Sequence, residues 1–188
     1  MSKVIAVCVG HSRQGDRSGA VNTAGVSEHT YNSKVGSILV RILNERGYTA
    51  VLLDKYPRTG YTAATRWVGD ECARLKADLA VELHFNSAGP FAEGHEWLYW
   101  HKSTLGRKCA QAFMDTFAAA FPQAKSRGVV AINHGDRGDG FLYRPPCPAV
   151  ICEPFFGSSK AETKLYGDKQ LAVAQAYAEA IDLVFFGS

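Results

Sequence analysis

Short apolar segments alternate along this chain with segments of helical periodicity, and this alternation constrains the fold more than any other feature. Residues 4–9 are apolar and largely β-branched, and Gly10 follows them, which is typical of a buried strand. Over 35–43, apolar residues recur three or four positions apart, which predicts a helix that Gly47 ends. The same patterns predict strands over 49–53, 78–86, 93–100 and 149–153, and helices over 61–76, 103–121 and 168–186. Strands alternating with helices predict an α/β fold: a single domain with a twisted, mostly parallel sheet flanked by helices.

Length and composition agree with one soluble catalytic or binding domain. The 188 residues predict a single domain over 1–188, which can bury roughly 70% of its unfolded surface. Apolar residues make up 46% and charged residues 21%, both ordinary for a soluble protein. The formal charge of +3 would suit a polyanionic partner such as a cell-wall polymer, but a solvated basic surface is the simpler explanation. No basic tract reaches the density that nucleic-acid binding needs, so we expect no nucleic-acid partner, and we expect a monomer.

The cysteines and the N-terminal residues indicate the cellular compartment in which the protein is made. The five cysteines are scattered and form no C-x-x-C pair, which argues against both a disulfide framework and an all-cysteine zinc site: Cys8, Cys72, Cys109, Cys147 and Cys152. Reduced thiols fit the cytosol. The first residues run straight into a strand without the pattern of a signal peptide. Apolar stretches are too short to span a bilayer. We therefore expect synthesis in the cytoplasm without a signal peptide and no stable membrane insertion.

Four polar residues occupy positions where α/β proteins assemble their sites. His11, His84 and Glu153 lie at or just after the ends of predicted strands, and Ser27 is a plausible N-cap that places Glu28 in the first turn of a helix. Sites in open α/β sheets gather at the carboxyl ends of strands, so these side chains can converge. Two imidazoles and a carboxylate can hold one zinc ion, and a spare carboxylate can accept a proton from water. This set predicts a metal-dependent hydrolase.

Each of these residues also has a simpler explanation. A single histidine at a strand end is commonly a hydrogen-bonded core residue. However, Glu82, His84 and Asn86 share one face of an apolar strand, and three buried polar groups are hard to satisfy without a function. His29 follows the helix glutamate directly and is a rival ligand by its chemistry. Glu153 could be a loop carboxylate in solvent.

Other motifs are weaker. His95 and Glu96 begin an H-E-x-x-H pattern, but Tyr99 stands where the second histidine is required, so the motif fails. The glycine-rich segment 135–140 does not link a clear strand to a helix and is predicted to be a loop. Several aromatic residues are predicted to belong to the core rather than to a sugar-binding platform: Trp97, Tyr99, Trp100, Phe155 and Phe156.

Several stretches together resemble the zinc-dependent N-acetylmuramoyl-L-alanine amidases of the Amidase_3 type. Val-Gly-His at 9–11 is similar to the family's first metal motif, and Glu28 with Asn32 four residues later looks like its helix-borne glutamate. Residues 77–86, which end in Leu-His-Phe-Asn, resemble its second histidine motif. Ser-Arg-Gly-Val at 126–129 resembles a further family segment, and 148–156 resembles the strand that carries the catalytic glutamate. The order and spacing of these pieces cover nearly the whole chain.

The resemblance implies roles for these residues. It implies that His11, Glu28 and His84 bind one zinc ion, which favours Glu28 over His29, and that Glu153 is the general base and then the general acid. The implied reaction hydrolyses the amide between the lactyl group of N-acetylmuramic acid and L-alanine of the peptidoglycan stem peptide. The implied fold and substrate agree with the α/β pattern and with a cell-wall partner.

The chain departs from the family pattern at a few positions. Ser12 follows the first histidine where glycine is usual, and Pro154 follows the glutamate. Glu82 stands where a small residue is common, and we predict that it orients a ligand histidine, although it could compete for the role of base. Asn86 and Arg127 are predicted to support the ligands or to contact the substrate.

The resemblance also implies a biological setting. Segment 86–100 is too short for the inhibitory helix that some exported members carry, and no separate wall-binding domain is evident. These features predict a phage or prophage endolysin, made in the cytoplasm and acting on the wall after release. A catalytic domain excised from a larger enzyme would look the same. The alternatives are another zinc peptidase on this scaffold and a non-catalytic peptidoglycan-binding relative.

Overall fold

A computed structural model describes residues 2–11, 19–56 and 60–187, which form six strands and six helices around one sheet. The strands are β1 (Val4–Val9), β2 (Thr49–Leu53), β3 (Leu79–Leu83), β4 (His95–Trp100), β5 (Ser126–Ile132) and β6 (Ala149–Glu153). Their order across the sheet is β2-β1-β3-β6-β4-β5. The first four of these run parallel, β4 is antiparallel to β6, and β5 is parallel to β4. The predicted α/β fold with a mostly parallel sheet is confirmed.

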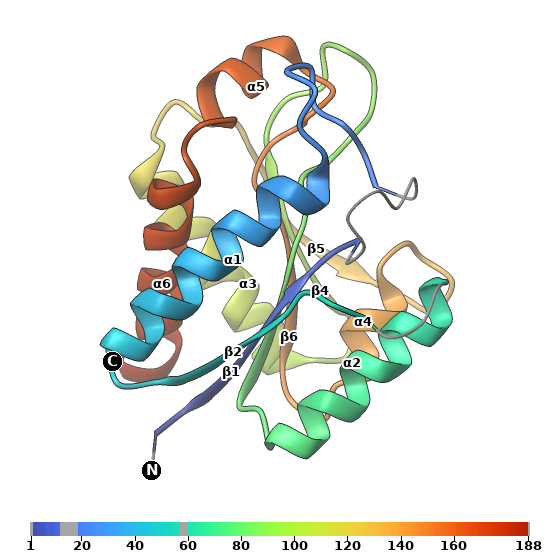
Figure 1. The fold of residues 1–188 in the computed structure, drawn as a ribbon, viewed down its shortest axis with the longest axis vertical. Coiled ribbons are helices and arrows are strands. Elements are labelled where there is room, and N and C mark those ends of the chain that lie inside the picture. The colour runs from blue at the N-terminus through green and yellow to red at the C-terminus, as the bar shows by residue number, and fades with distance from the viewer. Residues whose placement is uncertain (1, 12–18, 57–59, 188) are drawn as a thin grey trace.

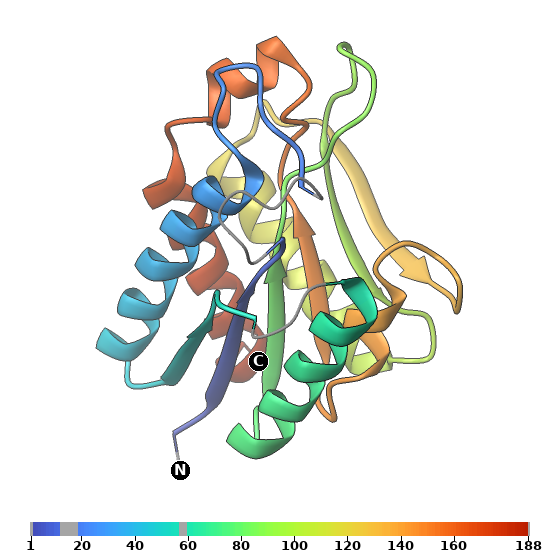
Figure 2. The ribbon, with the colours of Figure 1, turned by 45° about the vertical axis from the view of Figure 1, so that its right-hand side comes forward.

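Helices cover both faces of this sheet, as Figures 1 and 2 show. On one face lie α1 (Glu28–Glu45), α3 (Thr104–Ala120) and α6 (Gln170–Phe186), with α6 in contact with both of the others. On the other face lie α2 (Tyr61–Leu75) and the short α4 (Asp139–Tyr143), which contact each other. The short α5 (Lys160–Tyr166) lies beyond the end of the sheet toward which β1 and β3 point. Over the described ranges, no helix combines the length and apolar character needed to cross a bilayer.

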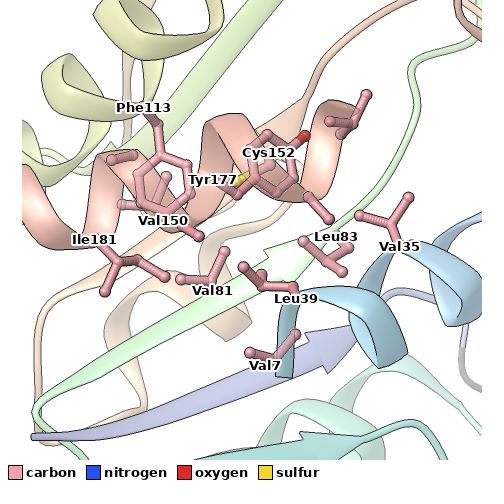
Figure 3. Close-up of a cluster of buried hydrophobic side chains, with 14 of the residues drawn as sticks. Val7, Val35, Leu39, Val81, Leu83, Phe113, Val150, Cys152, Tyr177 and Ile181 are labelled. Carbon is pink, nitrogen blue, oxygen red and sulfur yellow. The ribbon is translucent and has the colours of Figure 1, made fainter. Parts of the chain in front are cut away.

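The core is divided by the sheet into two layers, because the inner strands bury both of their faces. Alternate strand residues such as Val7, Val81 and Val150 pack under α1, α3 and α6, as Figure 3 shows. The intervening residues, Ala6 and Ile151 among them, pack under α2 and α4. Burial on both faces explains why these strands are nearly continuous apolar runs in the sequence. The polar residues at the strand ends therefore stand out from their surroundings.

Several predicted boundaries shift, and three elements were missed. The strand predicted over 78–86 ends at Leu83, and the helix predicted from 168 begins at Gln170. Strand β5 was missed because it lies at the edge of the sheet, exposes much of its surface and contains Gly128 at φ 89°. Helices α4 and α5 were missed because five and seven residues are too few to show a helical period. The loop predicted over 135–140 is partly wrong, since α4 begins at Asp139.

The aromatic residues lie where the sequence predicted. Trp97 and Phe155 are fully buried, and Phe156 is nearly so. Tyr99 packs against the larger core layer and Trp100 against the smaller one. Phe155 and Phe156 follow β6 at the end of the sheet where the polar residues gather, whereas Tyr99 and Trp100 lie at the opposite end, since β4 is antiparallel to β6.

Candidate metal centre and active site

Three of the predicted residues meet at the carboxyl ends of β1 and β3. Each of His11, Glu28 and His84 offers one potential ligand atom, and these atoms all lie within 4.8 Å of one another. His84 Nδ1 is 2.8 Å from Glu28 Oε1, and His11 Nε2 is 3.7 Å from Glu28 Oε2. The two imidazole rings stand nearly perpendicular, with centroids 5.2 Å apart. The structure thus brings together two imidazoles and a carboxylate, which is the donor set that zinc prefers.

The backbone at the end of β1 is shaped to admit both imidazoles. A Cβ at Gly10 would lie 2.2–2.6 Å from the ring of His84, so only glycine leaves room for that ring. His11 has φ 53°, a left-handed conformation that is uncommon for residues other than glycine. Such strained residues cluster at functional sites, where the surrounding structure holds them. The amide of Gly10 donates to the carbonyl of Leu83 and ties the two strand ends together.

Glu28 enters from the first turn of α1 and is held from several sides. The predicted N-cap is confirmed, because the Ser27 side chain accepts a hydrogen bond from the amide of Thr30. The Glu28 carboxylate accepts from the amide of Ala20 at 3.0 Å and from that of Phe85 at 3.1 Å. Only 1% of its surface is exposed. These bonds fix a buried carboxylate between the two histidines.

The electrostatics of this cluster favour a bound cation. Burial raises the pKa of Glu28, but the hydrogen bond and charge of His84, together with the charge of His11, outweigh it and lower the pKa overall. Burial lowers the pKa of His84, but Glu82 and Glu28 reverse the effect and raise it well above its ordinary value. Burial also dominates at His11, whose pKa is lowered. Positive charge is therefore stabilised between buried carboxylates, and a divalent metal can supply it in place of the His84 proton.

The competing ligand His29 lies outside the cluster. Its Nε2 is 3.4 Å from the hydroxyl of Ser33, one helical turn later. Among the described residues, the group able to hold a metal contains Glu28 and does not contain His29. The geometry thus favours the glutamate over its neighbour.

Glu82 contacts the second nitrogen of His84. Its Oε2 lies 3.2 Å from His84 Nε2, while Nδ1 faces Glu28. A carboxylate on the outer nitrogen of a ligand histidine fixes its ring orientation and raises its basicity. This contact agrees with the predicted orienting role of Glu82, whereas the role itself stays a prediction.

Glu153 ends β6 next to the cluster and is buried rather than solvated. In the sheet, Cys152 pairs with Leu83, and the amide of His84 donates to the carbonyl of Cys152 at 3.0 Å. Glu153 is only 5% exposed, and its Oε2 has no hydrogen-bond partner among the described residues. Burial raises the pKa of Glu153 to about 8, with the charge of His84 opposing this rise. A buried, unpaired carboxylate is costly to keep and is suited to exchanging protons near neutral pH.

Asn86 and Arg127 meet at Glu96, a residue that the sequence analysis did not assign to the site. Asn86 Nδ2 donates to Glu96 Oε1 at 2.6 Å, and Arg127 Nε donates to Glu96 Oε2 at 2.8 Å. Glu96 itself pairs with Glu153 across β4 and β6. The one signal for Glu96 in the sequence is a carboxylate within an aromatic strand, where the H-E-x-x-H pattern begins but is not completed. Ser12, one of the three departures from the family pattern, lies outside the described residues.

Comparisons with known proteins agree with this arrangement. The family model Amidase_3, described as N-acetylmuramoyl-L-alanine amidase, matches residues 5–182. The chain is similar to the catalytic domain of the amidase CwlV from Bacillus (Paenibacillus) polymyxa var. colistinus, at 26% identity and TM-score 0.79 over 96% of each chain. It is also similar to the amidase AmiC2 of Nostoc punctiforme, at 22% identity and TM-score 0.80 over 95% of this chain and 94% of that one. A third likeness is to the catalytic domain of the CD27L endolysin targeting Clostridia Difficile, at 22% identity and TM-score 0.79 over 95% and 96%. A comparison with curated protein sequences gives no match.

Proposed function

The chain belongs to the Amidase_3 family of N-acetylmuramoyl-L-alanine amidases, and from this premise we propose that it is a zinc-dependent enzyme with Glu153 as its base. The reaction would hydrolyse the amide between the lactyl group of N-acetylmuramic acid and L-alanine of the peptidoglycan stem peptide. The observation that carries the proposal is the convergence of His11, Glu28 and His84 beside a buried carboxylate with an unpaired oxygen.

The residues divide the chemical work. His11, Glu28 and His84 would hold one zinc ion, and a bound zinc ion acts as a Lewis acid toward water and the substrate carbonyl. Glu82 would keep the His84 ring oriented through its 3.2 Å contact. Glu153 would accept the proton of the attacking water on its carboxylate. It would then deliver that proton to the leaving amine of L-alanine.

The raised pKa of Glu153 suits this double role. A carboxyl group with its pKa at about 8 holds a proton far more readily than an exposed glutamate does. It can therefore take a proton in one step and return it in the next at neutral pH. A nearby metal charge would lower this pKa and keep a larger fraction of the resting group ionised.

We also propose that the enzyme acts as an endolysin. The likeness to the catalytic domain of the CD27L endolysin supports this role. The proposal places synthesis in the cytoplasm, with action on the cell wall after release. Added from outside, the protein should lyse cells only after their outer barrier is permeabilised, if the wall lies beneath an outer membrane.

The test of the enzymatic proposal is the clearing of purified peptidoglycan, with the metal content of the same sample measured in parallel. The expected result is clearing that a chelator abolishes and zinc restores, with stem peptides released from intact glycan strands. Glu153→Gln, loaded with zinc, is the matched inactive control. Cleavage within the peptides would indicate a peptidase instead, and binding without clearing by the zinc-loaded protein would indicate a non-catalytic relative.

A further inference from the structure

Arg127 lies at the start of β5, and part of its guanidinium makes no hydrogen bond to the described residues. Its side chain is 45% exposed, and Nε donates to Glu96 Oε2 at 2.8 Å. The guanidinium carbon lies 5.1 Å from the centre of the Phe156 ring, a cation–π contact. Among the residues that the structure describes, Nη1 and Nη2 have no hydrogen-bond partner. The free edge of the guanidinium is therefore open to an acceptor from solution.

The local backbone is built to hold this side chain in place. Gly94 has φ 108°, and a Cβ there would lie 3.0 Å from Arg127 Cγ and 2.6 Å from the carbonyl oxygen of Lys125. Glycine at this position thus makes room for the arginine. The carboxylate of Glu96 has both oxygens engaged, one by Asn86 and one by Arg127. Glu96 is a positioning residue that fixes the direction of the guanidinium.

The same contacts tie Arg127 to the reaction centre. Glu96 lies directly opposite Glu153 in the antiparallel pairing of β4 and β6. Directly opposed residues have Cβ atoms about 5 Å apart and side chains on the same face. One hydrogen bond then separates Glu96 from Arg127. An extended peptide advances about 3.5 Å per residue, so a ligand of Arg127 would lie only a few residues from a bond at Glu153.

We propose that Arg127 binds a free carboxylate of the stem peptide, on the D-glutamate residue that follows L-alanine. This inference rests on the proposed function. On the glycan side of the scissile bond, the lactyl carboxyl group is consumed in the amide and carries no charge. The anionic groups of the substrate lie on the peptide side. A planar guanidinium with two free nitrogens matches a carboxylate in a bidentate geometry, which a neutral amide cannot reproduce.

The test uses two synthetic substrates that differ in one group. Both have the γ-carboxyl group of the D residue, which the stem peptide uses for its next bond, capped as a methylamide. N-acetylmuramoyl-L-alanyl-D-glutamate then carries one free carboxylate, and its D-isoglutamine counterpart carries an amide there. The wild-type enzyme should show a kcat/KM about 10- to 100-fold higher for the carboxylate form, mainly through a lower KM. Arg127→Gln should remove this preference while leaving kcat/KM for the amide form near the wild-type value. Arg127→Lys keeps the charge but loses the planar pair of N–H donors. It should therefore retain only part of the preference for the carboxylate form.

A matched control and a second readout separate the explanations. Lys125→Gln removes an exposed neighbouring cation and should leave the preference intact. Calorimetric titration of the two free dipeptides measures binding without turnover. An equal loss on both substrates in Arg127→Gln, or an unchanged preference, would overturn the carboxylate site while leaving the amidase proposal standing. Arg127-dependent binding of the acidic dipeptide by an enzyme that cleaves neither substrate would keep the site and overturn the reaction.

Discussion

Replacing Glu153 with glutamine should abolish turnover and yet stabilise the metal-free protein at alkaline pH. Glutamine has nearly the same shape but cannot accept the proton of the attacking water, and loss of a general base typically costs about 10²- to 10⁴-fold in rate. Zinc should stay bound, because Glu153 does not belong to the group of residues able to hold the metal. The stability gain follows from burial, since the ionised carboxylate has an unpaired oxygen.

The size of this gain follows from the pKa of Glu153. Burial raises the pKa from its ordinary value of 4.5 to about 8, so the folded protein binds this proton more tightly than the unfolded chain does. The stabilising effect is complete below pH 4.5 and is lost as the pH rises to about 8. At about 1.4 kcal/mol per unit, this rise corresponds to about 5 kcal/mol. The neutral glutamine avoids that loss.

The assay is chemical denaturation of the metal-free wild type and Glu153→Gln at several pH values from 4.5 to 9. The difference in unfolding free energy should grow with pH in favour of the variant and level off above about pH 8. Glu179→Gln, at an exposed position on α6, is the control and should follow the wild type. A pH-independent difference, or a less stable variant at pH 9, would refute the assignment of a buried carboxyl group with a raised pKa.

Four further substitutions test the metal cluster. Gly10→Ala places a Cβ within 2.6 Å of the His84 ring, so zinc affinity should fall at least about 10-fold. Chelator competition measures this affinity, and an unchanged value would contradict the steric argument. Glu28→Gln should lose zinc in native mass spectrometry whereas His29→Gln keeps it, and the reverse would make the histidine the ligand. Glu82→Gln should lower zinc affinity about 10- to 100-fold and still turn over at saturating zinc. Loss of turnover with zinc bound would instead make Glu82 the base.

The sequence was most informative where burial leaves a clear local pattern of apolar residues. The strands of residues 4–9 and 149–153 are buried on both faces, so their apolar runs predicted both strands with the observed bounds. The edge strand β5 carries no such signal, because few of its residues are buried and Gly128 interrupts it. Its place beside β4 depends on contacts with the rest of the fold rather than on local pattern.

The same distinction separates the site residues that the sequence predicted from those that it did not. His11, His84 and Glu153 follow strands that the sequence predicted, and the rule that sites gather at the carboxyl ends of strands was enough to group them. Glu96 could not be found in this way, because it stands near the amino end of its strand. The prediction for its neighbour Arg127 rests only on the resemblance of residues 126–129 to a family segment.

The reversed direction of β4 and β5 explains why Glu96 and Arg127 nevertheless lie at the same end of the sheet as His11, His84 and Glu153. Since β4 is antiparallel to β6, its amino end lies beside the carboxyl end of β6, and β5 follows β4 in the same direction. Glu96 and Arg127 are each the second residue of their strand. They therefore lie at the end of the sheet where Glu153 ends β6. In an all-parallel sheet both residues would lie at the opposite end of the strands, several residues of extended chain away. The antiparallel junction thus places the proposed substrate-binding guanidinium near the proposed base, while the ends of β1 and β3 and the start of α1 supply His11, His84 and Glu28, the residues able to hold a metal.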